Sequence, residues 1–162
     1  MKKLFVLLFA GAVLASCGGS GYTTDQEEVV SGYDDMKEDA QAHYDALLEI
    51  EKSWAEDEKE MLKDYEGKLD KLIEKAAKDD DAKGALEDYR NAEYDYEREK
   101  SEKADDWYWK NWGIKQAKSD MENMLEGDAL KKFQDDVKKS QDAIDKIVEK
   151  HNKAVQDLNK EG

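Results

Sequence analysis

The chain has 162 residues, and its 41 Asp and Glu residues outnumber its 26 Lys and Arg residues to give a net charge of −15. This length allows one modest domain or one long helical assembly and excludes two ordinary globular domains. Charged residues make up 41% of the chain, and aliphatic residues are scarce beyond the first 16. This composition disfavours a thick-cored enzyme domain and favours an extended helical protein or a disordered one.

The amino-terminal segment has the features of a secretory signal peptide. Lys2 and Lys3 form a short basic region, and an apolar run follows from Leu4 to Ala15. A run of about 12 residues is too short to span a bilayer, which needs roughly 20. A basic start, a short apolar core and small residues after it together predict a signal peptide over residues 1–16.

The end of this segment, Leu14-Ala15-Ser16-Cys17, resembles the lipobox of bacterial lipoproteins. The resemblance covers residues 1–17 only and implies that Cys17 carries the lipid and becomes the first residue of the mature protein. It also implies a membrane anchor in the bacterial cell envelope, and because Gly18 is not Asp, an outer membrane location facing the periplasm is favoured. An ordinary signal peptide that happens to end near a cysteine is the alternative.

After Cys17, the sequence predicts a flexible tether over residues 17–32 and a helical domain over residues 33–162. Gly18-Gly19-Ser20-Gly21 has little ability to hold structure. From Tyr33 onward apolar residues recur at steps of three and four and almost never alternate, which favours helices over strands. We therefore expect an all-α fold, an elongated antiparallel bundle or coiled coil of about three long helices.

The first long helix is expected from about Asp34 to Lys78. The three-and-four spacing of its apolar stripe is interrupted by one extra residue before Tyr65. Such an insertion would locally alter any supercoil. The stripe consists of Ala40, His43, Leu47, Ile50, Trp54, Met61, Tyr65, Leu69, Leu72 and Ala76. Asp79-Asp80-Asp81 then offers capping residues, and Gly84 loosens the chain, so a turn between two helices is expected here.

The second helical segment begins with a stripe of Leu86, Tyr89, Ala92 and Tyr96. This stripe fades between Glu97 and Asp106, where the sequence offers little to bury. It resumes with Trp107, Ile114, Ala117, Met121 and Met124. Whether one helix is continuous between Leu86 and Leu125 stays open at this point. Gly127 is typical of a helix end and Asp128 of the next N-cap.

The last helix has the clearest pattern, because its apolar positions alternate steps of three and four without a break. They are Leu130, Phe133, Val137, Ser140, Ile144, Ile147, His151, Ala154 and Leu158. Four acids each have a lysine four residues later, an order that favours ion pairs along a helix. The expected pairs are Asp128–Lys132, Asp135–Lys139, Asp142–Lys146 and Glu149–Lys153.

One segment has more large aromatic rings than packing in a thin bundle requires. Residues 107–112 hold three of the four Trp residues of the chain. On a helix these rings point in different directions: Trp107 lies near the apolar stripe, Tyr108 and Trp112 lie together, and Trp109 lies about 200° from Trp107. Aromatic rings beside Lys110 and Asn111 are typical of protein recognition sites, and also of membrane interfaces and sugar-binding surfaces. We therefore take Tyr108, Trp109 and Trp112 as candidate partner contacts, with an aromatic plug at one end of the bundle as the alternative.

Other chemistry finds little support in the sequence. His43 and His151 both occupy stripe positions and could meet, but two histidines without a third ligand at a suitable spacing are weak evidence for a metal, and no metal or other cofactor is expected. The stretch from Asp79 fails the EF-hand pattern, because Lys83 and Arg90 stand where oxygen ligands are needed. No nucleophile motif or phosphate-binding loop is present, and the negative charge disfavours nucleic acid.

These observations predict a lipid-anchored, non-enzymatic interaction or spacer protein of the bacterial envelope. It would be held to the membrane through Cys17 and would contact a protein partner. The alternative is a periplasmic holdase-like protein that binds client polypeptides through the aromatic segment. Such a protein should expose apolar surface when free, so a hydrophobic dye would distinguish the two.

Overall fold

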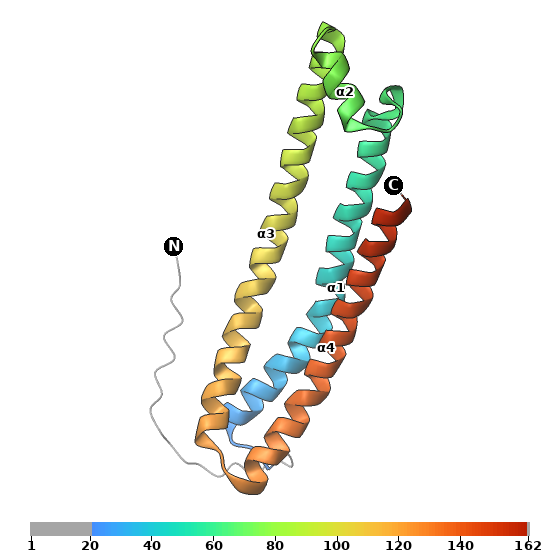
Figure 1. Cartoon of the computed structure of the whole chain (residues 1–162). Coiled ribbons are helices and arrows are strands. Elements are labelled where there is room, and N and C mark those ends of the chain that lie inside the picture. Colours follow the sequence, from blue (N-terminus) through green and yellow to red (C-terminus); the bar gives the residue numbers. More distant parts are fainter. Residues whose placement is uncertain (1–20, 162) are drawn as a thin grey trace, which may run out of the picture.

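A computed structural model describes residues 21–161, which form an elongated all-α structure (Figure 1). Three long helices, α1 (Thr24–Met61), α3 (Asp80–Met124) and α4 (Gly127–Glu161), run along its length. A short 3-10 turn, η1 (Lys63–Tyr65), and the short helix α2 (Leu69–Ala76) form one tip. The all-α prediction of about three long helices is confirmed, with α2 as an additional short helix.

Helix α1 lies between the other two long helices, because α3 and α4 both pack against it and make little direct contact with each other. Consecutive long helices run antiparallel, so α1 and α4 run in the same direction (Figure 1). Because α1 lies between them, α3 and α4 are separated away from the turn that joins them (Figure 1). This separation leaves room for a cleft in the upper half of the structure.

Two apolar cores hold the helices together. The larger core joins α1, α3 and α4 in the lower half and includes Tyr33, Phe133 and Val137, which are at most 1% exposed. The smaller core lies at the tip, where Leu62, Leu72 and Leu86 pack together. Burying one apolar side chain of this size contributes about 1.5–3 kcal/mol to the stability of the fold. A slender structure buries few such side chains in any one place, so both cores are needed to hold the helices together.

The first helix begins at Thr24, not near Asp34, and this corrects the predicted boundary between tether and helical domain at residues 32 and 33. Thr23 is its N-cap and forms a capping box with Gln26, which satisfies backbone N–H groups at the start of the helix. Tyr22 is also held, because its hydroxyl donates a hydrogen bond of 2.7 Å to Asp136 Oδ2 on α4. The ammonium of Lys132 lies 3.4 Å from the centre of the Tyr22 ring.

The predicted end of the first helix at Lys78 is also wrong, because α1 ends at Met61. Glu66 and Gly67 adopt left-handed backbone angles, with φ of 60° and 69°, and turn the chain into α2. The extra residue in the apolar stripe marks this break. Asp79 caps α3 as expected, since its side chain accepts a hydrogen bond of 2.9 Å from the backbone of Asp81.

Helix α3 is continuous across the polar stretch between Glu97 and Asp106, which answers the question that the sequence left open. It ends at Met124, and Gly127, which was expected at a helix end, is instead the first residue of α4, with a left-handed φ of 58°. In α4 all nine predicted stripe positions are buried or half-buried. None of the four predicted ion pairs is among those that the described residues form, because Lys132 and Lys139 both pair with Asp136 and Asp142 pairs with Lys138.

Candidate functional site

The aromatic segment lies on α3, and helical geometry divides its rings between the core and the solvent. Trp107 is 8% exposed and belongs to the larger core, as its place in the apolar stripe predicts. Tyr108, Trp109 and Trp112 are 58%, 64% and 53% exposed. The alternative of an aromatic plug is therefore wrong for these three rings, which are exposed on the side of a long helix.

The three exposed rings contact one another and form one surface, which we call the aromatic patch (Tyr108, Trp109 and Trp112). The ring centres of Tyr108 and Trp109 lie 5.3 Å apart, and those of Trp109 and Trp112 lie 6.1 Å apart, both edge to face. Edge-to-face pairs at these distances are favourable in themselves. The patch is therefore a continuous apolar surface and not three separate side chains.

Trp107 fixes the direction in which the patch points. Its indole stacks on the His43 ring of α1, with ring centres 4.8 Å apart and planes 11° from parallel. Tyr44 packs edge to face against the same indole at 5.8 Å. These contacts prevent α3 from rotating about its own axis. An ion pair of 2.8 Å between Lys110 and Asp39 adds a second link between α3 and α1. The patch is thus held outward by a rigid support.

Both histidines pack against Tyr44. His43 packs edge to face on the Tyr44 ring, and the His151 ring lies 5.1 Å from it. His151 Nδ1 is 3.1 Å from the carbonyl oxygen of Tyr44, a contact that requires the proton on Nδ1 because a carbonyl only accepts. Burial, followed by the charge of His151, lowers the pKa of His43. Within residues 21–161, no group of three or more His, Cys, Asp or Glu side chains is placed to hold a metal ion.

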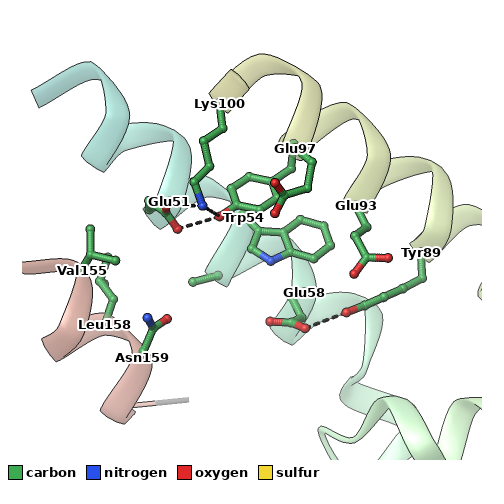
Figure 2. Close-up of a pocket in the computed structure, with 12 residues that line it drawn as sticks. Glu51, Trp54, Glu58, Tyr89, Glu93, Glu97, Lys100, Val155, Leu158 and Asn159 are labelled. Atoms are coloured by element: carbon green, nitrogen blue, oxygen red, sulfur yellow. Dashed lines mark hydrogen bonds and ion pairs between the residues drawn. The ribbon is translucent and has the colours of Figure 1, made fainter. Parts of the chain in front are cut away.

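A second site, which the sequence did not predict, is a cleft of about 310 Å³ bounded by α1, α3 and α4 (Figure 2). Its aromatic floor is Trp54 of α1 stacked on Tyr96 of α3, with ring centres 5.0 Å apart and planes 13° from parallel. Val155 and Leu158 form an apolar wall on α4. Trp54 was predicted as a stripe residue, but no spacing within one helix could indicate that three helices form a cleft around it.

Hydrogen bonds to carboxylates connect α1 to α3 along this cleft. The Tyr96 hydroxyl donates 2.7 Å to Glu51 Oε2, and the Tyr89 hydroxyl donates 2.7 Å to Glu58 Oε1. Lys100 Nζ lies 2.9 Å from Glu51 Oε1. Burial opposes the charge on Glu51, but hydrogen bonds from Lys100 and Tyr96 outweigh it and lower its pKa. Burial also opposes the charge on Lys100, yet Tyr96 and Glu51 together raise its pKa.

The comparisons with known proteins give no relative for this chain. No protein-family model, no curated protein and no solved structure matches it. Among residues 21–161, no helix is long and apolar enough to cross a membrane. The predicted signal peptide of residues 1–16 and the predicted lipidation site Cys17 lie outside the described residues.

Proposed function

We propose that this protein is a lipid-anchored, non-enzymatic interaction and spacer protein of the bacterial cell envelope. Cys17 attaches it to the membrane, the long helices extend from the anchor, and the aromatic patch binds one protein partner. The observation that carries the proposed partner contact is the joined surface of Tyr108, Trp109 and Trp112, three large rings more than half exposed on a supported helix.

The exposed rings of the patch are of the residue types that proteins use for recognition. Trp and Tyr are the residues most enriched at the energetic centres of protein interfaces. They also lose little conformational entropy on binding when their support is already ordered. Here the stack of Trp107 on His43 provides that order before any partner arrives. The patch therefore has both the apolar area and the preorganisation that recognition needs.

Length supports the spacer part of the proposal. Helix α3 has 45 residues, which correspond to about 68 Å at 1.5 Å per residue. The amino-terminal end of α1 lies at the end of the molecule opposite the α2 tip (Figure 1). A lipid on Cys17 would therefore attach the protein near one end. The acidic surface, with a net charge of −15, would limit adhesion to other anionic surfaces.

The distribution of exposed apolar residues favours a specific partner over many client chains. A holdase needs broad apolar surface to bind unfolded polypeptides. Outside the patch, the large exposed hydrophobic residues of the described chain are Ile73, Tyr94 and Met124. They are more than ten residues from one another and from the patch along the helices. One compact patch therefore supports a single recognition site.

A photo-crosslinking amino acid at Asp105 tests the proposal in intact cells. Asp105 is exposed and lies one helical turn before Trp109, so the probe stands beside the patch and leaves its rings in place. A probe at Glu99, which is exposed on another face of α3, is the matched control. We expect position 105 to capture one envelope protein that position 99 does not capture. Trp109→Ala should abolish this capture.

Three results would contradict the proposal. Capture of the same proteins from positions 105 and 99 would mean that the patch has no specific partner. A broad ladder of captured chains at position 105, together with strong binding of a hydrophobic dye by the free protein, would support the holdase alternative. Capture that persists in the Trp109→Ala variant would place the contact elsewhere on α3.

A further inference from the structure

The cleft between α1, α3 and α4 already holds one alkylammonium group, that of Lys100. Its Nζ lies 2.9 Å from Glu51 Oε1 and 2.9 Å from the Tyr96 hydroxyl, and 5.0 Å from the centre of the Tyr96 ring. A carboxylate, a phenol oxygen and an aromatic face are groups that stabilise an ammonium ion. This arrangement shows what kind of ion the cleft accommodates.

The other half of the cleft repeats these groups without a cation. Glu93 and Glu97 extend from α3 toward the indole of Trp54, and Glu58 lies below it on α1 (Figure 2). Within residues 21–161, none of these three carboxylates forms an ion pair with a Lys or Arg side chain. Glu58 receives only the neutral hydroxyl of Tyr89. Three carboxylates around an indole therefore face the cleft with no positive charge between them.

The third wall of the cleft is suited to an alkyl chain. Val155 and Leu158 stand on α4 opposite the aromatic floor, and Asn159 adds a polar group at its end. A volume of about 310 Å³ lies at the lower end of the range for small-molecule sites, roughly 300–1,000 Å³. The cleft therefore suits a small flexible molecule better than a segment of polypeptide.

We propose that this cleft binds a small linear polyamine, with one ammonium group between Glu93 and Glu97 against the face of Trp54 and the alkyl chain along Val155 and Leu158. The ligand's ammonium takes the same kind of surroundings that Lys100 has in the other half. This site is separate from the aromatic patch, and the inference does not depend on the proposed partner contact.

Titration of the nitrogen-15-labelled full chain with spermidine tests this site. Each of the four Trp residues gives its own indole N–H signal, and a Trp54→Phe variant assigns the signal from the cleft. We expect the Trp54 signal to move and saturate at about 150 mM salt, where weak long-range attraction is screened. The signals of Trp109 and Trp112 should stay in place, because these rings lie outside the cleft.

Two charge-matched variants on α3 separate a built site from general attraction. Glu93→Gln with Glu97→Gln removes two carboxylates that line the cleft and have no ion-pair partner, so the fold should be retained. Glu99→Gln with Glu102→Gln makes the same change in charge outside the cleft. We expect the first variant to bind spermidine about tenfold more weakly and the second to bind as the parent does.

Several outcomes would overturn the inference. Equal weakening in both double variants would show that binding follows total charge and not the cleft. A Trp54 signal that moves as much with Mg²⁺ at equal ionic strength would show a general response to cations. A Trp54 signal that does not move with spermidine would show that the cleft takes no polyamine.

Discussion

The imidazole of His43 lies flat against the indole of Trp107, with ring centres 4.8 Å apart and planes 11° from parallel. The pair joins α1 to α3 at the point where the aromatic patch begins. Burial and the neighbouring His151 disfavour a positive charge on His43, and Lys103 and Lys110 act in the same direction. Asp106 opposes them. The neutral ring is therefore the form that packs against Trp107.

This lowered pKa predicts a pH dependence of stability. The unfolded chain takes up a proton on His43 near the ordinary value of 6.5, whereas the folded chain resists it until a lower pH. The contribution of the neutral ring is therefore present above pH 6.5 and is lost as the pH falls from there toward the lowered value. We expect urea unfolding to give a lower free energy of unfolding at about pH 5.5 than at about pH 7.5.

His43→Phe is the matched variant for this prediction, because a phenyl ring keeps the stack on Trp107 and does not titrate. The difference in unfolding free energy between the two pH values should be smaller in this variant than in the parent. An unchanged difference would assign the pH dependence to other groups.

The proposed lipid attachment at Cys17 gives a second prediction. Cys17 is the only cysteine in the chain, so no other thiol is available for lipid attachment. In cells grown with an alkyne fatty acid, the parent protein should carry the label. The Cys17→Ser variant should lose the label and accumulate as an uncleaved or mislocalised precursor. Label that persists in the Ser variant would refute the lipoprotein interpretation.

Sequence patterns predicted the parts of the fold that depend on one helix at a time. The spacing from Leu130 to Leu158 identified the buried face of α4, and helical geometry separated the buried Trp107 from the exposed Trp109. The start of α1 could have been found, because Thr23 and Gln26 have the spacing of a capping box. An interpretation of residues 17–32 as one tether missed this local signal.

Other features depend on contacts between helices or on competing local choices. Lys139 has Asp135 four residues before it and Asp136 three residues before it, and the structure uses Asp136. Asp136 is also the residue that receives the hydroxyl of Tyr22, a contact across 114 positions that no local pattern predicts. The cleft beside Trp54 likewise combines three helices. In the sequence, the carboxylates that line it look like ordinary surface charges.

Close packing of α1 on α3 at Gly32 gives a third prediction. A Cβ on Gly32 would lie 2.5 Å from Ile114 Cδ1, whereas a Cβ on Gly113 would meet nothing within 4 Å. Both glycines are inside helices, where Ala is favoured over Gly by roughly 0.5–1 kcal/mol. Gly113→Ala should therefore raise the free energy of unfolding by about this amount. Gly32→Ala should raise the free energy of unfolding by less than this amount or lower it, because Ile114 must move. Equal gains would show that the contact is not tight.

The last prediction concerns Trp107 and Trp109, two residues of the same type that lie two positions apart on α3. Trp107 is 8% exposed and stacks on His43, so Trp107→Ala leaves a cavity in the larger core. Replacing a buried Trp by Ala costs about 3–5 kcal/mol, a large share of the stability of a slender protein. Trp109 is 64% exposed, so Trp109→Ala should change the free energy of unfolding by no more than about 0.5 kcal/mol.

Thermal and urea unfolding of the two variants measure this difference directly. Ala is a good helix former, so neither change should disturb α3 through its backbone. The Trp109→Ala protein should melt close to the parent temperature and should still lose its crosslinked partner, because the proposed role of this ring is recognition. A Trp109→Ala protein that unfolds as readily as Trp107→Ala would show that the patch is part of the packing, and the proposal of a recognition surface on α3 would then fail.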